Sequence, residues 1–493
     1  MTRTRNPGTK NAGSRNTAAI LTIILVSYFM ILLDNSVIFT ALPSLAVDLA
    51  LAPAELAWVQ DAYTLVFGGL LLLGARAGDI LGRRRVFVFG LAVFSIASLL
   101  IALAPMAWLL IAARALQGVG AAIVAPSALS LLTASFEGAA RDRSVAWYAA
   151  TAGIGASLGM LVGGAAATLL SWRAGFWINV PIGIAMIVLA PRFLPETRTS
   201  PGRFDATGAI TSTLGIGGLV FALLRGAEAG WGDPLTLASF AAATALIIVF
   251  VLAESRAAQP IMPLRLFRSR IRIRTGAYLV RLTYLGAMIG FFFFTTQFLQ
   301  GVLGFTALQA GLAFLPMTLV NFVVALAIPR LVARAGNWWP LVVGVALTLA
   351  GMLWLSRLAP DSAYLTGVAL PMLLIGAGQG LAFAPMTTFG ISGATTADAG
   401  AASGVVNTFH QVGMSLGLGI LVAVAAASDT GTASAEVALA GEVAAALTAA
   451  TVLLGIAFVL AIALIVPSRP RIPAVGGTIS PSLSTRTTRT LEA

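Results

Sequence analysis

The chain has 493 residues, of which 58% are hydrophobic and only 10% are charged, and its mean hydropathy is +0.95. Soluble globular domains are about half apolar and about a quarter charged, so this composition excludes them. The net charge of +12 could indicate a nucleic-acid-binding protein, but the basic residues form short clusters between long apolar runs. Such clusters orient membrane spans, so the sequence predicts an integral membrane protein that binds no nucleic acid.

Three scarce residue types exclude several kinds of chemistry. The chain has no cysteine, one histidine (His410) and one lysine (Lys10). Disulfides, thiolate metal sites and multi-histidine metal centres are therefore excluded, and no metal is expected. A phosphate-binding P-loop needs a lysine directly after its glycines, and this sequence has none there. No cofactor is expected, and the energy for any uphill work must come from a gradient or from a partner.

Apolar runs long enough to cross the ~30 Å hydrocarbon core follow one another along the chain. The basic N-terminus leads directly into the first run, without the small-residue cleavage site of a signal peptide. About fourteen spans are predicted, near 17–40, 56–74, 86–104, 107–132, 145–168, 175–194, 207–224, 234–253, 276–299, 308–329, 339–356, 364–386, 402–426 and 443–466.

The predicted fold class is therefore all-α integral membrane. Two six-helix bundles, 17–194 and 276–466, are joined by two additional spans in 207–253. Residues 1–16 and 467–493 are expected to be tails. The second tail is rich in Pro, Ser, Thr and Arg, which predicts disorder.

Charged residues orient the spans. Arginines gather at both ends of the chain and in every second loop, as in Arg83–Arg85 and Arg330–Arg334, whereas the alternate loops carry mainly acidic residues. Loops rich in positive charge stay in the cytoplasm. The sequence thus predicts a multi-pass protein of the bacterial cytoplasmic membrane with both termini in the cytoplasm.

A short polar segment, 73–85, separates the second and third apolar runs. Asp79 precedes Arg83 by four residues, which suits a salt bridge if the helix is continuous, and glycines permit a tight turn. The segment is either a simple topology anchor or a cytoplasmic gate that holds two helical bundles closed. It resembles the signature loop of the major facilitator superfamily, from which Ala75 and Ala77 depart. The expected gating residues are Gly78, Asp79, Gly82, Arg83 and Arg84.

Ionisable side chains inside membrane spans are costly and therefore informative. Asp34 lies in the first span, where low dielectric disfavours the charged carboxylate, so the side chain could take up and release a proton. The alternative is an aspartate near a helix end that is hydrated at the outer interface. The segment 33–43 resembles the first-span signature of the fourteen-span drug:proton antiporters, matched by Asp34, Ala41, Leu42 and Pro43.

Asp61 lies in the second span among aromatic residues. A carboxylate surrounded by Trp58, Tyr63 and Phe67 could attract an organic cation by charge and by cation–π contact. The alternative is an interfacial aspartate in an aromatic belt. The combination of Trp58, Asp61 and Tyr63 resembles the quaternary-ammonium and dye exporters of the same branch.

Arg114, Gln117 and Gly118 share one face of the fourth span, because they lie three and four residues apart. They resemble the superfamily's fourth-span signature. The resemblance implies that a buried Arg114 near Asp34 modulates its protonation, so both residues are expected to couple protons. The alternative is that Arg114 only binds backbone carbonyls.

The fifth span carries glycines at a four-residue spacing. Gly155, Gly159 and Gly163 share one face, so a neighbouring helix can approach closely. Together with Gly164 they resemble the antiporter motif of the family, although Met160 stands where the motif has proline. The alternative is a generic packing seam.

The C-terminal half contains segments similar to the same family, such as 376–385 and 403–417, but no central carboxylate. His410 is expected to be a satisfied helix histidine, and the alternative is a side chain that titrates near neutral pH. Arg281 is expected to extend its head group to the cytoplasmic interface, and the alternative is a contact with substrate. The residues expected to bind substrate are Asp61, Trp58, Tyr63, Gln117, Asn321 and Gln379.

The resemblance extends over nearly the whole chain. It implies a monomeric, proton-coupled exporter of amphipathic drugs, often cationic, that works by alternating access and is not an enzyme. Its expected partners are the drug, protons and membrane lipids. The alternatives are a proton-coupled importer or a lipid or metabolite translocator on the same fold, an intramembrane enzyme, and a non-transporting sensor.

Overall fold

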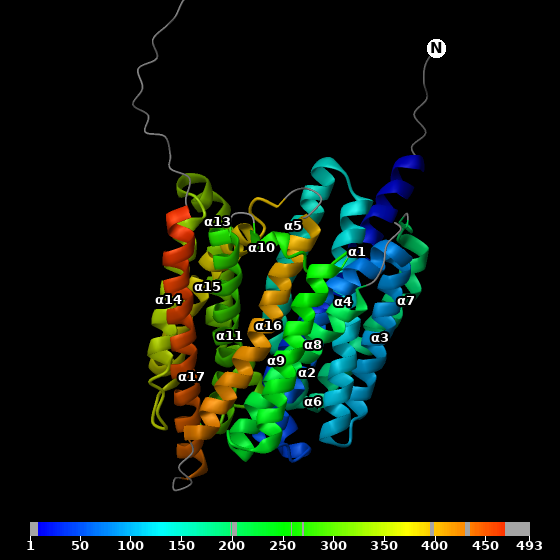
Figure 1. Ribbon diagram of the computed structural model, residues 1–493. Coiled ribbons are helices and arrows are strands. Elements are labelled where there is room, and N and C mark those ends of the chain that lie inside the picture. Colours follow the sequence, from blue (N-terminus) through cyan, green and yellow to red (C-terminus); the bar gives the residue numbers. More distant parts are fainter. Residues whose placement is uncertain are drawn as a thin grey trace, which may run out of the picture.

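A computed structural model of the chain is a bundle of long helices that run roughly side by side (Figure 1). It describes residues 8–197, 199, 205–257, 259–268, 271–394, 399–428 and 434–468. Residues 1–7 and most of the tail predicted at 467–493 lie outside these ranges. The remainder of the N-terminal tail is not separate, because the first helix already begins at Gly8.

Helices before residue 197 form the N-terminal half of the molecule. They are α1 (Gly8–Asp48), α2 (Pro53–Leu81), α3 (Arg83–Leu103), α4 (Ala107–Ser135), α5 (Gly138–Leu169), α6 (Trp172–Trp177) and α7 (Asn179–Phe193). Two further helices follow, α8 (Ala206–Ala229) and α9 (Pro234–Arg256).

Helices after residue 264 form the C-terminal half. They are α10 (Arg265–Arg268), α11 (Ile271–Gly301), α12 (Ala307–Ala313), α13 (Leu315–Ala335), α14 (Trp338–Leu355), α15 (Leu370–Gly390), α16 (Ala399–Ser428) and α17 (Ala435–Leu460). A π-helical turn, Tyr364–Ala369, leads into α15, and the short turns Ala461–Ile465 and Val466–Ser468 extend α17.

Thirteen helices in the described residues are long and apolar enough to cross a membrane, and α5 contributes a shorter apolar stretch, Leu158–Leu169. The predicted fold class, an all-helical protein that crosses the membrane many times, is confirmed. Two predicted spans each consist of a short helix and a long one, α6 with α7 and α12 with α13. Pro316 lies in the first turn of α13, a position where a helix tolerates a residue without an N–H group.

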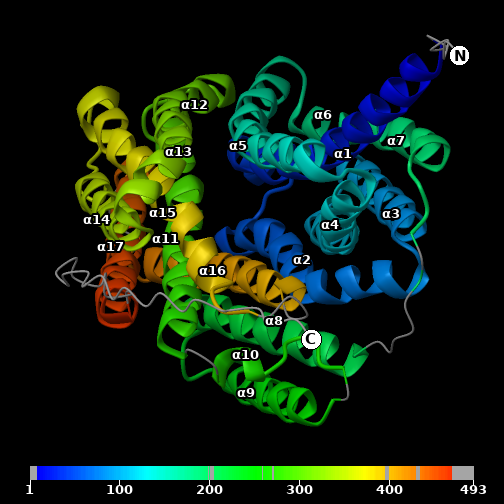
Figure 2. The ribbon, with the colours of Figure 1, turned by 90° about the horizontal axis from the view of Figure 1, so that it is seen from above.

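Seen along the helix axes, the two halves lie on opposite sides of a seam where α2 of one half and α16 of the other lie side by side (Figure 2). Both additional helices lie outside this seam, since α8 packs on α2, α16 and α9. Close approach along the seam requires glycine: a Cβ at Gly68 of α2 would collide with Gln411 of α16, and one at Gly404 would collide with Leu72.

The start of α1 and the end of α17 lie at the same end of the bundle, here called the termini end (Figure 1). Contacts at the opposite end, the far end, join the two halves. Gln300 Nε2 of α11 donates to the carbonyl of Thr40 in α1 over 3.2 Å. The backbone N–H of Leu308 in α12 donates to Thr168 Oγ1 of α5 over 3.0 Å.

Candidate functional site

Asp34 lies well inside α1 and is completely buried. Because α1 continues to Asp48, the aspartate is not at a helix end, and the hydrated-interface alternative does not describe this structure. Ionised groups in such an environment need charged or hydrogen-bonding partners.

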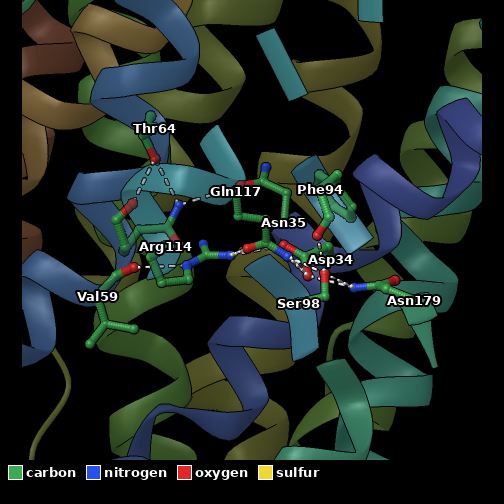
Figure 3. A network of polar contacts seen from close by, with 10 residues as sticks. Asp34, Asn35, Val59, Thr64, Phe94, Ser98, Arg114, Gln117 and Asn179 are labelled. Carbon is green, nitrogen blue, oxygen red and sulfur yellow. Dashed lines mark hydrogen bonds and ion pairs between the residues drawn. The ribbon is translucent and has the colours of Figure 1, made fainter. Parts of the chain in front are cut away.

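Those partners come from α4 and α7, and a residue of α3 extends the network (Figure 3). Arg114 Nη1 of α4 donates to Asp34 Oδ2 over 2.8 Å. Gln117 Nε2 of α4 and Asn179 Nδ2 of α7 donate to Asp34 Oδ1 over 2.7 and 2.8 Å. Ser98 Oγ of α3 accepts from Gln117 over 2.8 Å. Arg114, Gln117, Asn179 and Ser98 have no exposed surface, so a single carboxylate organises a dry polar network.

Arg114 also connects this network to α2. Its Nε donates to the carbonyl of Val59 over 3.0 Å, and its guanidinium carbon lies 4.4 Å from the centre of the Tyr63 ring. Arg114 therefore binds both a backbone carbonyl and Asp34, so the two interpretations of this residue coexist. Its Nη2 is buried and has no hydrogen-bond partner among the described residues. A buried guanidinium with an unsatisfied N–H group is stabilised mainly by its one counter-charge, here Asp34.

Every hydrogen bond of Asp34 in the described chain is made within the N-terminal half. The face of α1 that contacts the other half is a different one, formed by Phe39, which stacks on Phe292 of α11, and by Thr40. Asp34 is thus inside the N-terminal bundle and not on the surface between the halves.

Asp61 differs from Asp34 both in its place and in its hydrogen bonding. It is completely buried on α2 next to the hydroxyl of Ser415 on α16, and neither carboxylate oxygen meets a described residue with the geometry of a normal hydrogen bond. A buried carboxylate at the seam between the halves, without a well-formed hydrogen bond in the described chain, is a candidate functional position.

The predicted aromatic surround of Asp61 is not formed. Tyr63 is two residues further along α2, which places it on the other side of the helix. There it packs on Arg114, with Phe67 as its aromatic neighbour at 5.8 Å. Trp58 is half-buried against the hydrophobic core.

Gly82 alone separates α2 from α3, with a φ of +101° that favours glycine. The predicted ion pair between Asp79 and Arg83 is present at 3.0 Å, although the helix is broken between them. The backbone N–H of Arg84 donates to Glu196 Oε1 over 3.1 Å, and Arg83 Nη1 donates to the carbonyl of Ser130 over 3.4 Å. In this conformation these contacts hold the turn against its own half, and Gly78 faces Arg83.

The glycines of α5 line its contact with α1. A Cβ at Gly155, Gly159 or Gly163 would lie 2.6–2.8 Å from atoms of α1. Gly164 faces the backbone of Ala307 in α12, across the junction of the two halves. Met160, where the family motif has proline, is buried inside the continuous helix α5.

The predicted substrate residues are not gathered in one place. Gln117 is sealed inside the Asp34 network. Asn321 of α13 and Gln379 of α15 are half-buried in the C-terminal half, and neither side chain makes a hydrogen bond among the described residues. Arg281 was expected to reach the membrane interface, but only 2% of it is exposed and it contacts His410 of α16 at 3.0 Å.

Sequence reasoning did not single out Asn179, Ser98 or Glu196 as site residues. Asn179 and Ser98 are the polar side chains that approach Asp34 from α7 and α3. The available signal was a polar residue in the middle of an apolar run. Glu196 could have been noticed as an acid in a segment of otherwise basic character.

Comparison with known proteins adds evidence independent of this geometry. The family model described as Major Facilitator Superfamily matches residues 24–418. A cephamycin export protein of Amycolatopsis lactamdurans is 40% identical over 478 residues, which is 95% of this chain and 96% of the relative. A puromycin resistance protein of Streptomyces alboniger is 38% identical and covers 81% of this chain and 80% of its own length. The multidrug resistance protein Stp of Mycobacterium tuberculosis is 32% identical over 84% of this chain and 77% of its own length.

Solved structures are similar at the level of the fold. The POT family transporter PepTSo superposes with a TM-score of 0.64 at 14% identity, covering 91% of this chain and 96% of that one. A bacterial homologue of the lysosomal transporter Spinster gives a TM-score of 0.64 at 15% identity, covering 90% of this chain and 96% of that one.

Proposed function

This chain belongs to the major facilitator superfamily, and from that premise we propose that it exports amphipathic drugs, antibiotics among them, in exchange for protons. Membership confirms the prediction of a secondary transporter and not an enzyme. Support for drug export comes from relatives named for cephamycin export, puromycin resistance and multidrug resistance, which align with most of the chain.

The observation that carries proton coupling is the buried pair of Asp34 and Arg114. When Asp34 takes up a proton, the ion pair loses its negative member and the guanidinium is left in a dry site with an unmatched charge. Breaking a buried pair in this way costs about 3–5 kcal/mol. The protein can recover that energy by moving Arg114 toward another partner, so protonation favours a different arrangement of helices.

The path from this pair to the substrate runs through α2. Arg114 binds the Val59 carbonyl and lies against Tyr63 on one side of α2. Asp61, on the other side, faces the C-terminal half. A shift of Arg114 therefore acts on the helix that also carries the unpartnered carboxylate, which couples two sites without direct contact.

Asp61 is the proposed contact for the cationic group of a substrate. A buried carboxylate without a hydrogen bond gains most from an ammonium group, which brings both charge and donors. One proton exchanged for one monovalent cation is electroneutral and is driven by the pH difference alone. A neutral substrate makes transport electrogenic, with about 2.3 kcal/mol available per 100 mV.

The turn at Gly82 is the proposed gate at the termini end. Asp79, Arg83 and Arg84 are about one-third exposed and form their ion pairs within the N-terminal half. Because these pairs reach solvent, they can exchange partners when the two halves approach each other. Both termini are proposed to be cytoplasmic, because arginines gather at that end. The chain has no cysteine, so labelling single introduced cysteines from outside would test this orientation.

The decisive experiment is puromycin transport in proteoliposomes, with and without an imposed pH gradient. We expect accumulation of puromycin that is driven by the gradient and abolished by a protonophore. Downhill movement that ignores the pH difference would contradict proton antiport. Absence of puromycin transport, and of any response in a growth-inhibition panel of antibiotics and dyes, would contradict drug export itself.

A further inference from the structure

The C-terminal half holds a buried positive charge that nothing in the function above uses. Arg281 lies in α11 with 2% of its surface exposed. Asp361 is the one acidic residue between 271 and 397 in the sequence, and it follows α14 at the far end. Among the described residues, no carboxylate forms an ion pair with Arg281. Buried arginines are normally paired, so this one lacks its expected partner.

Within the described part of the chain, the polar and cation–π contacts of the Arg281 head group are with neutral side chains. Nη1 donates to Thr387 Oγ1 of α15 over 2.8 Å, and Nη2 donates to His410 Nδ1 of α16 over 3.0 Å. The guanidinium carbon lies 4.6 Å from the centre of the Phe383 ring. Nε is buried and has no hydrogen-bond partner in the described chain. The head group is therefore held in place while donors remain free.

Two other buried arginines show how the head group of such a residue is neutralised or held elsewhere in this protein. Arg114 is neutralised by Asp34. Arg274, one helix turn from the start of α11, donates to the carbonyls of Leu266 and Ser392 and so fixes a chain connection. Among the described residues, Arg281 has neither a carboxylate nor a backbone carbonyl as a partner, which distinguishes it from Arg114 and from Arg274.

His410 can donate a second hydrogen bond to a ligand beside Arg281. A guanidinium can only donate, so His410 Nδ1 must accept, and the neutral imidazole then carries its proton on Nε2. The surroundings are open enough for a ligand: Phe383 is 37% exposed, and Asn407, one turn before His410 on α16, is exposed. Gln411, next to His410, is the residue that packs against α2 at the seam of the two halves.

We propose that Arg281 and His410 form a receptor for a carboxylate group of the exported substrate. This inference rests on the drug-export function and specifies its substrate class: amphipathic compounds that carry a free carboxylate. Such a group would supply the missing counter-charge and accept hydrogen bonds from guanidinium N–H groups and from His410 Nε2, and guanidinium with carboxylate is a strong, directional pair. A substrate with both charges could bind here and at Asp61 on the opposite half.

The test is calorimetric binding to the purified protein in nanodiscs. The probes are three amphipathic monocarboxylic acids, cefoxitin, benzylpenicillin and nalidixic acid, each compared with its methyl ester. We expect at least one acid to bind roughly tenfold or more tightly than its ester. In Arg281→Gln this preference is lost while the affinity for the ester stays, which also shows that the variant is folded.

Arg272→Gln is the matched control, because it removes an exposed positive charge from the same helix and leaves the preference intact. Should Arg281→Gln not fold, Arg281→Lys keeps the charge and is expected to retain part of the preference. The proposal is overturned if no acid is preferred over its ester, or if the preference survives in Arg281→Gln. It is also overturned if Asp61→Asn abolishes the preference equally, because the preference would then not come from Arg281 in particular. Gradient-driven export of puromycin without any preference for acids would leave drug export standing and refute this site alone.

Discussion

Replacing Asp34 with asparagine removes one negative charge from the buried network and almost nothing else. The amide has the shape of the carboxylate, and its oxygen can still accept from Gln117 and Asn179, which lie 2.7 and 2.8 Å from Oδ1. Its NH2 group must then face Arg114 Nη1, which now lies 2.8 Å from Oδ2. Two donors would then point at each other in a site that has no surface exposed to solvent.

The size of the effect follows from burial. Both members of the pair have side chains with 0% exposure, so solvent cannot screen the charge that is left behind. Losing one partner of a buried ion pair costs about 3–5 kcal/mol of unfolding free energy. The double variant, Asp34→Asn with Arg114→Gln, removes both charges and is expected to regain most of this stability.

The double variant should regain stability but should not regain proton-driven transport. In proteoliposomes, one pH unit supplies about 1.4 kcal/mol per proton, enough for a tenfold accumulation of puromycin. We expect wild-type protein to reach such a gradient. Neither Asp34→Asn nor the double variant should do so, although both should still exchange labelled for unlabelled puromycin. Thermal unfolding followed by tryptophan fluorescence reports stability in the same preparations.

Two results would refute this reasoning. If Asp34→Asn accumulates puromycin in response to the pH gradient as wild type does, Asp34 is not the coupling residue. If the double variant is no more stable than the single one, the loss does not come from an unmatched guanidinium.

Three further predictions concern the seam, the glycine contact and the turn. Asp61→Asn should weaken binding of cationic puromycin about tenfold, or ~1.4 kcal/mol, and leave neutral substrates unchanged; equal loss for both in a binding titration would exclude a charge effect. Gly159→Ala, which brings a Cβ within 2.6 Å of Ser36, should lower unfolding free energy by about 1–3 kcal/mol, whereas Gly455→Ala, with nothing within 4 Å, should not. Asp79→Asn should slow transport at least tenfold and change the free energy of unfolding by less than about 1 kcal/mol, whereas Arg85→Gln should leave the transport rate unchanged. If the turn is only a topology anchor, neither variant will change the transport rate.

The sequence was a good guide wherever a property depends on neighbours along the chain. Hydrophobic length predicts the spans because each helix must cross the same hydrocarbon thickness. The Asp79–Arg83 pair formed as its four-residue spacing suggested, even though Gly82 interrupts the helix. The glycines of α5 share a face for the same local reason and meet α1 there.

It was a poorer guide to the aromatic residues near Asp61 and to Arg281. Tyr63 was grouped with Asp61 because both lie in one short segment, but residues two apart point to opposite sides of a helix, and Tyr63 packs on Arg114. Arg281 was expected at the interface because basic residues lie shortly before it. Packing of α15 and α16 over α11 buries it instead.

Composition and periodicity alone establish that this is a many-span helical membrane protein, because burying apolar side chains in lipid requires long apolar runs whatever their packing. They also place acidic and basic residues at particular depths. Which of these residues meet is decided by the rotation and crossing of helices far apart in the chain: Asp34 and Arg114 are 80 residues apart, and Arg281 and His410 are 129 apart. Within the described residues, tertiary packing therefore neutralises the charge of Asp34, leaves Asp61 without an ion pair, and places Arg281 among neutral side chains.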